Sequence, residues 1–591
     1  MNGGSAPGAL YEGEGRCRFT VWAPVHPAIQ VRLLDPGERL EALEPGPGGW
    51  HTALVEGVEP GALYRIRLSD GSELPDPASR RQPHGVHGPS AVADPAFDWS
   101  AAAPKTVRMQ GMVLYEIHVG TFTPEGTFDA IIPRLTALRD LGVTAVELMP
   151  VAAFPGERNW GYDVAYPYAV QESYGGPAGL RRLVDACHRT GLAVVLDVVY
   201  NHLGPEGSYL ERFGPCFTDR YRTPWGRALN FDGPGSDEVR RFFIEAALYL
   251  QSAFRIDAFR VDAVHAIVDA SARPFLQELT EAIHERARGE GREVAVIAES
   301  DLNDVKVLRP AGDGGLGFDA QWADDFHHAA HAFVTGERAG YYADFGKLGD
   351  LARAHQSAFV YAGQHSVFRG RRHGNSAEGL SPERFVASTQ NHDQVGNRAT
   401  GDRLAASLDS RDQRLLAALL LLSPWVPLLF MGQEYGETAP FAYFTSHSDP
   451  GLGEAVREGR RAEFAAFGWS PEAIPDPQDP ATFRAATLRW ESREKEPHLR
   501  LLELHRDLLR LRRRLPALAR PSLEAQTVAV DGKMLKVLRG PRGDRILALF
   551  SFSAEDAAPG RLPAGRWTRL LDTEETRWGG AGTGFPAGRV E

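Results

Sequence analysis

Cysteine is scarce in this sequence of 591 residues, where Cys17, Cys187 and Cys216 are the only three. An odd number of widely spaced cysteines gives no metal-ligand pattern, and it is typical of reduced thiols in a cytoplasmic protein. We therefore expect a cytoplasmic location and no disulfide framework.

Long apolar runs are missing as well. The most apolar stretch, residues 415–431, is interrupted by Ser423, Pro424 and Pro427, whereas a membrane span needs about 18 or more uninterrupted apolar residues. The first eight residues, MNGGSAPG, have neither the positive start nor the apolar core of a secretory signal. We expect no membrane partner.

Basic clusters are absent too. Lysine and arginine number 65 against 77 aspartates and glutamates, so the formal net charge is 65 − 77 = −12, and no run of basic residues resembles a nucleic-acid-binding stripe. This excludes nucleic acid as the expected partner and leaves a neutral, polar substrate open. The composition, 43% hydrophobic and 24% charged, predicts a globular chain of two to four domains.

Glycine and proline are plentiful, and they separate short alternating segments at both ends of the chain. Such segments predict β-strands joined by turns. Near the N-terminus they lie at 18–22, 29–34, 50–55 and 62–68, and near the C-terminus at 525–530, 534–539, 545–552 and 567–571. We predict an N-terminal β-sandwich over residues 1–105 and a C-terminal β-sandwich over residues 518–591.

The segment between them, residues 106–517, alternates strand and helix patterns. Predicted strands lie at 113–119, 145–150, 193–200, 254–262, 294–299, 385–390 and 427–431, and predicted helices at 127–141, 179–190, 236–252, 274–287, 411–422 and 500–514. Such alternation is typical of an α/β fold with a parallel sheet, and eight units close a (β/α)8 TIM barrel. A doubly wound open sheet is disfavoured because no Gly-x-Gly-x-x-Gly follows the first strand.

Polar residues follow many of the predicted strands. Arg260 and Asp262, two positions apart on one strand, point to the same face, and burying them is costly unless they pair or act on a ligand. In a barrel the strand ends meet at one face, where the active site lies. The other residues at these ends are His118, Asp197, Asn201, His202, His265, Glu299, His392 and Asp393.

Each of these residues also has an ordinary structural explanation. Asp197 could cap a loop, Asn201 could form a turn, and His202 could be a satisfied core histidine. Taken together they point to function, because carboxylates at the ends of neighbouring barrel strands repel one another unless a function requires them.

Four segments resemble the signature regions of the α-amylase superfamily of glycoside hydrolases and transglycosylases. They are 197–202, 257–265, 298–301 and 389–393, and the stretches 115–128, 159–163, 196–207, 322–328 and 390–398 narrow the resemblance further. As a set they are most similar to superfamily members that hydrolyse the α-1,4 bond next to the terminal trehalose of a maltooligosyltrehalose. The resemblance thus implies an oligosaccharide substrate and no cofactor, and we expect a monomer or a simple homo-oligomer.

The resemblance also implies roles for individual residues. Asp262 becomes the nucleophile, Glu299 the general acid/base and Asp393 the stabiliser of the transition-state sugar. Tyr162 is expected to stack on that sugar, and Asp324 to help recognise trehalose. The full set of implied substrate contacts is His118, Tyr162, Asp163, His202, Arg260, His265, Asp324 and His392.

Physical chemistry supports the three carboxylate roles. Cleaving a glycosidic bond needs one protonated and one ionised carboxyl group. Arg260 beside Asp262 favours the ionised form, whereas Glu299 follows an apolar strand that favours the protonated form. A nucleophilic Asp262 predicts retention of configuration, with the Asp262 and Glu299 carboxyl groups ~5–5.5 Å apart.

Several positions depart from the superfamily pattern and leave fine specificity open. Ala258 and Val164 stand where relatives usually carry glycine, and Gln433 stands where an acidic residue is common. Asn201 matches a position that holds calcium in many amylases, but the other ligands are not identifiable, so we predict no metal site. Two alternatives remain: a branching or debranching enzyme of the same superfamily, and a binding protein on an inactive barrel.

Overall fold

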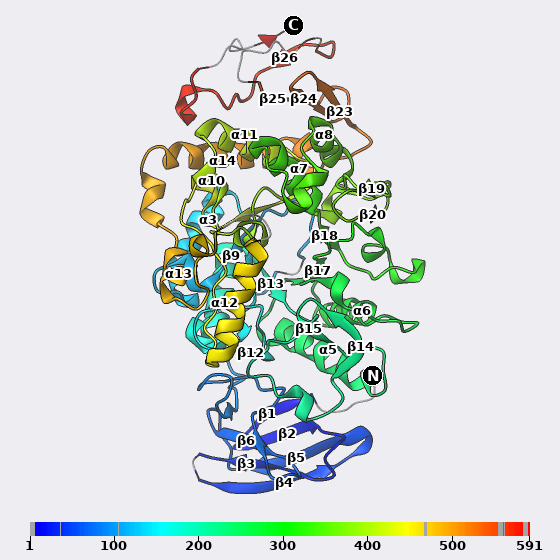
Figure 1. The fold of residues 1–591 in the computed structure, drawn as a ribbon, viewed down its shortest axis with the longest axis vertical. Helices are drawn as coiled ribbons and strands as arrows, with labels where there is room; N and C mark the ends of the chain where they lie inside the picture. The colour runs from blue at the N-terminus through cyan, green and yellow to red at the C-terminus, as the bar shows by residue number, and fades with distance from the viewer. Residues whose placement is uncertain are drawn as a thin grey trace.

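The computed structural model describes residues 6–35, 37–104, 106–465, 470–553, 560, 562–582 and 589–590. The N-terminal sheet lies at one end of the long axis, the barrel in the middle and the C-terminal strands at the other end (Figure 1). Within the described ranges, no helix is both long enough and apolar enough to span a bilayer. The division at residues 105 and 517 stays a prediction.

The N-terminal part is one antiparallel sheet that bends over its own core. Strand β4 pairs with β3 along most of its length and with β5 at Glu44 and Pro45, so it belongs to both halves. Phe19 from one half and Tyr64 from the other meet with ring centroids 5.0 Å apart. The strands are β1 (Gly8–Gly13), β2 (Arg16–Trp22), β3 (Ile29–Leu33), β4 (Arg39–Pro45), β5 (Trp50–Glu56), β6 (Leu63–Arg67), β7 (Glu73–Leu74) and β8 (Ser90–Ala91).

Eight parallel strands close the central barrel, which confirms the predicted (β/α)8 fold. The last strand pairs back to the first through Leu428 and Leu114, so the sheet has no open edge and the doubly wound alternative is wrong. In barrel order the strands are β9 (Leu114–Ile117), β10 (Ala145–Leu148), β13 (Ala193–Val198), β16 (Ala258–Val261), β17 (Ala295–Ala298), β18 (Ala320–Trp322), β21 (Phe385–Ser388) and β22 (Val426–Phe430).

The barrel interior is apolar at one end and charged at the other. Small side chains, among them Ala145, Ala258 and Ala320, fill its amino-terminal end together with larger apolar groups. Because side chains alternate along a strand, the residue two positions after Ala258 points to the same interior. That residue is Arg260, which lies where the carboxyl ends of the strands converge.

Helices surround the barrel, and the six predicted helices are present to within a few residues, the first of them as α2 and α3 joined by a short 3₁₀ turn. The helix α4, for example, buries Leu180, Leu183, Val184 and Cys187 at helical spacing and ends at Gly191, whose φ is +82°. The helices of four residues or more around the barrel are α1 (Val119–Phe122), α2 (Phe128–Ile131), α3 (Leu135–Leu141), α4 (Gly176–Thr190), α5 (Ser236–Ala253), α6 (Phe275–Gly289), α7 (Asp324–Thr335), α8 (Leu348–Ser357), α9 (His392–Gly396), α10 (Leu404–Ser407), α11 (Ser410–Leu421), α12 (Pro450–Ala465), α13 (Pro480–Ala485), α14 (His498–Arg514) and α15 (Pro516–Ala519).

Two hairpins extend from the strand ends of the barrel. One joins β14 (Phe217–Thr223) to β15 (Gly226–Leu229), and the other joins β19 (His365–Ser366) to β20 (Arg371–Arg372). A third short pairing brings β11 (Ala152–Ala153) against β12 (Tyr166–Val170). These insertions explain why the barrel segment is much longer than the ~250 residues of a plain barrel.

The C-terminal part carries two small antiparallel sheets. The first consists of β23 (Gln526–Asp531), β24 (Met534–Arg539) and β25 (Ile546–Ser551), and the second pairs β26 (Trp567–Thr568) with β27 (Arg589–Val590). Arg539 attaches the first sheet to the barrel by donating a 3.0 Å hydrogen bond to the carbonyl of Leu422. The remainder of the predicted C-terminal sandwich includes positions outside the described residues, so the sandwich itself stays a prediction.

Candidate active site

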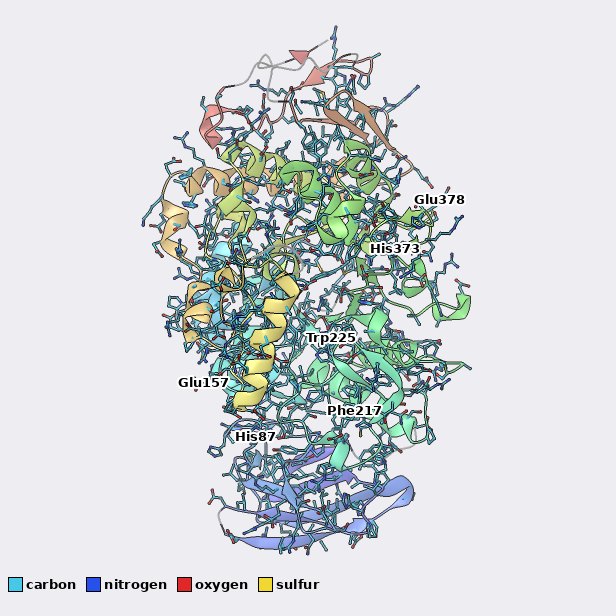
Figure 2. The ribbon with its side chains drawn as sticks, in the orientation of Figure 1. His87, Glu157, Phe217, Trp225, His373 and Glu378 are labelled. Carbon is cyan, nitrogen blue, oxygen red and sulfur yellow. The ribbon has the colours of Figure 1, made fainter. Side chains whose placement is uncertain are left out.

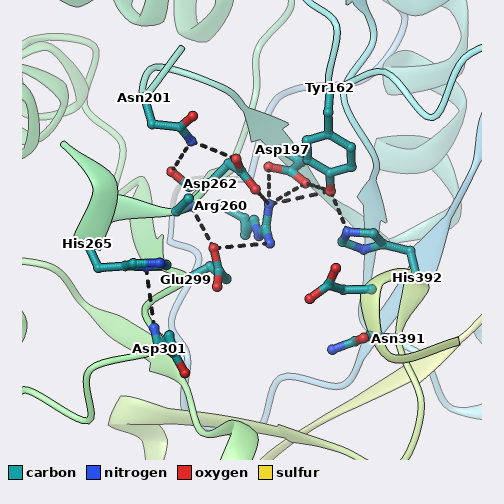
Figure 3. Close-up of polar contacts among 12 residues, drawn as sticks. Tyr162, Asp197, Asn201, Arg260, Asp262, His265, Glu299, Asp301, Asn391 and His392 are labelled. Atoms are coloured by element: carbon teal, nitrogen blue, oxygen red, sulfur yellow. Dashed lines mark hydrogen bonds and ion pairs between the residues drawn. The ribbon is translucent and has the colours of Figure 1, made fainter. Parts of the chain in front are cut away.

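A single buried arginine organises the carboxylates at the barrel mouth (Figure 3). The Arg260 Nη1 donates to both carboxylate oxygens of Asp197 at 2.9 and 2.8 Å and to the Oδ1 of Asp262 at 2.7 Å. Its Nη2 lies 3.8 Å from the Oε2 of Glu299. The predicted pair of Arg260 and Asp262 is therefore present, and the same guanidinium reaches two further carboxyl groups.

Burial of this cluster is costly, and the arginine charge offsets only part of the cost. Arg260 is 2% exposed, and its guanidinium carbon lies 4.5 Å from the centroid of the Trp322 ring. Burial raises the pKa of Asp197 to about 6, although the Arg260 charge acts to lower it. The pKa of Asp197 therefore lies closer to neutral pH than that of an ordinary aspartate.

Asn201 holds the other side of Asp262. Its side-chain Nδ2 donates to the Oδ2 of Asp262 at 2.7 Å and to the backbone carbonyl of the same residue at 3.0 Å. Its Oδ1 accepts a short hydrogen bond from the Nδ1 of His202. One oxygen of Asp262 is therefore held by Arg260 and the other by Asn201. No group of His, Cys, Asp or Glu in the described part of the chain could hold a metal ion.

The backbone next to Asp262 is strained in a way that reaches Glu299. Ala263 adopts φ +40° and ψ +50°, the left-handed region that non-glycine residues seldom occupy. This conformation directs its N–H to the Oε2 of Glu299 at 2.6 Å, and the N–H of Val264 donates to the Glu299 carbonyl at 3.0 Å. Strain of this kind is often found at active sites.

Glu299 lies in surroundings that favour its protonated form. Burial raises the pKa of Glu299 well above its usual value, and the negative charges of Asp262, Asp324 and Asp393 raise it further, while Arg260 opposes the shift. Asp262 instead accepts hydrogen bonds from Arg260 and Asn201, and these favour an ionised carboxylate. The two carboxyl groups therefore differ in the way that acid and nucleophile roles require.

His392 and Asp393 enter the site from the start of helix α9. The Nδ1 of His392 donates to the Oε1 of Glu116 at 2.6 Å, and its Nε2 lies 2.8 Å from the hydroxyl of Tyr162. That hydroxyl donates to the Oδ2 of Asp197 at 2.6 Å. Asp393 accepts a 2.6 Å hydrogen bond from the Nδ2 of Asn397, and burial raises its pKa.

The remaining predicted substrate contacts lie around this cluster. Asp163 accepts a 2.6 Å hydrogen bond from the Nδ2 of Asn159. His202 stacks on Trp225, which lies between β14 and β15 and is labelled in Figure 2, with ring centroids 4.9 Å apart. His265 is exposed, and its Nδ1 accepts a 3.4 Å hydrogen bond from the backbone of Asp301.

Asp324 faces a separate hollow beside the carboxylates. Burial raises the pKa of Asp324 to about 7, and the charges of Asp393, Asp301 and Asp325 add to the rise. The lining of the hollow includes Asp301, Asp324, His328, Tyr341, Phe368 and Arg369. Acidic, aromatic and basic side chains thus converge next to the site.

The structure argues against His118 as a substrate contact. The side chain is 1% exposed, its Nδ1 lies 2.9 Å from the Oγ1 of Thr121, and its Nε2 lies 2.9 Å from the carbonyl of Asn159. Phe441 and Phe444 pack against the ring. His118 is a satisfied core histidine, because both ring nitrogens already have protein partners.

Comparison with known proteins decides the family. The model of the alpha amylase catalytic domain matches residues 82–222. Malto-oligosyltrehalose trehalohydrolase of Arthrobacter ramosus is 49% identical over 530 residues, which cover 89% of this chain and 91% of the relative. The enzyme of the same name from Saccharolobus solfataricus is 46% identical over 495 residues, covering 84% and 85%. This chain belongs to the malto-oligosyltrehalose trehalohydrolase family.

The fold comparison agrees with the family. A solved structure from Salmonella typhimurium, assigned there to the alpha amylases, has a TM-score of 0.88 and 40% identity, and covers 96% of this chain and 97% of its own. As a member of the trehalohydrolase family within the alpha-amylase enzymes, the chain is a glycoside hydrolase.

The sequence of this trehalohydrolase family member identifies Asn201 as a strand-end residue, but it shows neither the contact of Asn201 with Asp262 nor that of Glu116 with His392. Both contacts join segments far apart in the chain, and a single sequence does not show which side chains meet. Gln433 is engaged internally, since its Nε2 donates to the Oγ1 of Thr389 at 2.7 Å. That contact explains how an amide is accommodated at this position.

Proposed function

We propose that this protein hydrolyses the α-1,4-glucosidic bond next to the terminal trehalose of a maltooligosyltrehalose, with retention of configuration. The products are trehalose and a shortened maltooligosaccharide. The reaction class is supported above all by the Arg260 guanidinium, which contacts both Asp262 and Glu299, while the surroundings of Glu299 favour its protonated form. The trehalose-ended substrate is supported by the relatives, whose names specify it.

In the first step Asp262 attacks the anomeric carbon of the glucose unit that precedes trehalose. Glu299 donates its proton to the glycosidic oxygen, the bond between carbon and oxygen breaks, and trehalose leaves with that proton. A covalent glycosyl ester on Asp262 remains. Hydrogen bonds from Arg260 and Asn201 orient the attacking carboxylate.

In the second step Glu299, now ionised, takes a proton from water. The resulting hydroxide attacks the anomeric carbon, the ester bond to Asp262 breaks, and the maltooligosaccharide leaves with its original configuration. Two inversions at one carbon give net retention. The separation of ~5–5.5 Å between the Asp262 and Glu299 carboxyl groups stays a prediction of this scheme.

Positive charge develops on the sugar ring in both steps, and the surrounding carboxylates stabilise it. Asp393 takes this role, and Asp197 adds negative charge deeper in the barrel. Tyr162 presents its ring to the same sugar, and His202 is placed to bind the sugar hydroxyl groups. The sequence-based expectation that His392 binds these hydroxyls is not kept, because both of its ring nitrogens have protein partners, Glu116 and the Tyr162 hydroxyl. Asp163 lies next to Tyr162, and His265 is exposed near Asp301 and is kept as a proposed substrate contact.

We assign recognition of the trehalose unit to the side chains around Asp324. The acidic side chains there can accept hydrogen bonds from sugar hydroxyls, and the aromatic side chains there can stack on sugar rings. D324A should therefore weaken cleavage of maltotriosyltrehalose. Normal cleavage by this variant would remove Asp324 from trehalose recognition.

Product analysis tests the proposal directly. Purified maltotriosyltrehalose is incubated with the enzyme, and the sugars released are identified by chromatography against standards. Free trehalose and maltotriose are expected. Release of linear chains from amylopectin, or formation of new branches in amylose, with maltotriosyltrehalose left intact would identify a debranching or a branching enzyme instead.

Two isosteric variants test the carboxylate roles. D262N and E299Q should each lower kcat by at least about 10³-fold, since each removes a group that reacts in the transition state. Binding of maltotriosyltrehalose, measured by calorimetry, should stay within about threefold of wild type. Unchanged turnover by either variant would refute its assigned role. The proposal also includes a place in trehalose biosynthesis, which the trehalose product supports. It includes a cytoplasmic location, which the three widely spaced cysteines support.

A further inference from the structure

A further carboxyl group lies beneath the catalytic cluster, and the reaction scheme does not use it. Glu116, on strand β9, is 1% exposed and contacts His392 twice. The backbone N–H of His392 donates to its Oε2 at 2.8 Å, and the ring Nδ1 donates to its Oε1 at 2.6 Å. Glu116 thus fixes both the main chain and the ring of the residue that precedes Asp393.

The neighbouring strand carries a carboxyl group in a very different state. Glu147 pairs in register with Glu116 and is also 1% exposed. Neither of its oxygens has a hydrogen-bond partner among the described residues. Burial raises the pKa of Glu147 well above its usual value, and the charge of Glu116 adds to the rise. The surroundings of Glu147 therefore favour its neutral form, and Glu116 is the carboxyl group that faces His392.

The hydrogen bonds around the His392 ring fix where its protons lie. The hydroxyl of Tyr162 gives its own hydrogen to Asp197 at 2.6 Å, so it accepts from the Nε2 of His392 at 2.8 Å. The Nδ1 donates to Glu116. Since both ring nitrogens act as donors, the ring is an imidazolium.

Other groups around His392 bear on this charge. Burial and the positive charge of Arg260 lower the pKa of His392, but the charge and hydrogen bond of Glu116 outweigh them, and the pKa is raised. Asp393 acts in the same direction as Glu116. Trp160 and Trp322 contribute rings with centroids 5.8 and 6.1 Å from that of His392. Of the groups around the ring, Glu116 makes the direct ion pair.

We propose that Glu116 is a positioning residue for the reaction: it keeps His392 doubly protonated, so that His392 fixes the Tyr162 hydroxyl on Asp197 beside the reacting sugar. The inference rests on the proposed function, in which Tyr162 contacts that sugar. Glu116 itself touches neither substrate nor the reacting carboxylates, and its effect passes through His392.

A double-mutant cycle tests whether the effect passes through His392. E116Q keeps the size of the side chain and removes its charge, and kcat/KM for maltotriosyltrehalose at pH 7 should fall about 10- to 100-fold, as expected for loss of a charge-assisted hydrogen bond. In the H392Q background the same change should have little further effect. Losses that simply multiply would overturn the proposal.

The pH dependence provides a second measurement. Glu116 raises the pKa of His392, so removing its charge leaves the ring neutral at a pH where the wild-type ring is still protonated. At a pH below the His392 pKa of both proteins, the ring is protonated in wild type and in E116Q alike. The ratio of E116Q to wild-type kcat should therefore rise as the pH is lowered. A ratio independent of pH would mean that E116Q acts on packing alone.

Two further variants serve as controls. E147Q makes the same isosteric change at the neighbouring, already neutral carboxyl group, and kcat/KM should stay within about twofold of wild type. E116D keeps the charge but withdraws it from the His392 ring, so its loss of activity should be smaller than that of E116Q and should also shrink as the pH is lowered. If thermal unfolding shows that E116Q does not fold, E116D decides: a deficit that does not change with pH would overturn the proposal. Wild type that leaves maltotriosyltrehalose uncleaved would instead overturn the proposed function.

Discussion

At the scale of single residues, the carboxyl groups of the site differ in the hydrogen-bond donors that surround them. Asp262 has a donor on each oxygen, from Arg260 and Asn201. Glu299 has one backbone donor, from Ala263, and is surrounded by like charge. The same chemical group therefore suits attack at one position and proton donation at the other.

Asp324 provides a pH-dependent test at this scale. Its negative charge helps to raise the pKa of Glu299, so D324N should lower that pKa. Because the proposed mechanism needs Glu299 protonated, the alkaline limb of the kcat profile should move to lower pH. The pH dependence of kcat is measured with saturating maltotriosyltrehalose.

The matched control for this prediction is D313N. Asp313 is an exposed carboxylate on the loop before β18, and the alkaline limb should stay where it is in wild type. A D324N limb that coincides with that of D313N would show that Asp324 does not act on Glu299. A movement to higher pH would contradict the sign of the interaction.

Single residues also show which parts of the site could be predicted from the sequence. Asp262, Glu299 and Asp393 could be picked out because acidic side chains at several barrel strand ends are costly without a function. His118 also follows a barrel strand, yet both of its ring nitrogens are engaged, by Thr121 and Asn159. Which direction a polar side chain takes after a strand depends on neighbours that the linear sequence does not reveal.

At the scale of elements, alternation and helical spacing predicted most of the barrel. The helix α7 was not predicted because its buried face carries polar residues, so the sequence lacks the apolar residues at helical spacing. His327, His328 and His331 are buried together with Phe326 and Ala329. The predicted strand at 254–262 is longer than β16 (Ala258–Val261) because residues 254–257 form a turn that leads into the strand. There the chain turns at Arg255, whose φ is +52°, and buries Asp257.

Asp257 ties three elements together at the amino-terminal end of the barrel. Its Oδ2 accepts from the Nε2 of His188 on α4 and the backbone N–H of Val194 on β13, both at 2.8 Å, and its Oδ1 accepts from Arg292 before β17 at 2.9 Å. D257N should lower the free energy of unfolding by about 3–5 kcal/mol, because Arg292 would be left buried beside an amide that cannot balance its charge. Urea titration followed by circular dichroism measures the loss.

D140N is the matched control for this change. Asp140 forms a 2.8 Å ion pair with Arg139 in which both side chains are about half exposed, at 55% and 50%. Such surface pairs contribute about 0–1 kcal/mol, so D140N should unfold almost as wild type does. Equal losses for D257N and D140N would show that the Asp257 contacts do not stabilise the barrel.

At the scale of the whole molecule, one buried carboxylate joins segments far apart in the chain. Glu206, in the loop after β13, lies 3.0 Å from the Nε2 of His87 and 3.1 Å from the Nδ1 of His447, and it accepts from the backbone of Ser448. His87 precedes β8 and lies where the N-terminal sheet meets the barrel (Figure 2). The Glu206 carboxylate thus connects its own loop with the N-terminal domain, through His87, and with a second barrel loop, through His447 and Ser448.

The pH dependence of unfolding tests this junction. Burial acts to raise the pKa of Glu206, but hydrogen bonds from His87, Ser448 and His447 outweigh it, and the pKa is lowered. Stability that depends on the ionised form is fully present above the ordinary carboxyl pKa and is lost as the pH falls through the lowered folded-state value. At pH 7, E206Q should therefore unfold with about 1–3 kcal/mol less stability than wild type, the typical value for losing hydrogen bonds to a charged group.

The difference between E206Q and wild type should then shrink as the pH is lowered, since wild-type Glu206 becomes neutral as well. E211Q is the control, because Glu211 is exposed on the same loop and its carboxylate pairs only with Arg227 at 3.2 Å among the described contacts. A deficit for E206Q that stayed constant from pH 7 into acid would assign the effect to side-chain packing. The three segments would then be held together by their apolar contacts and not by the shared anion.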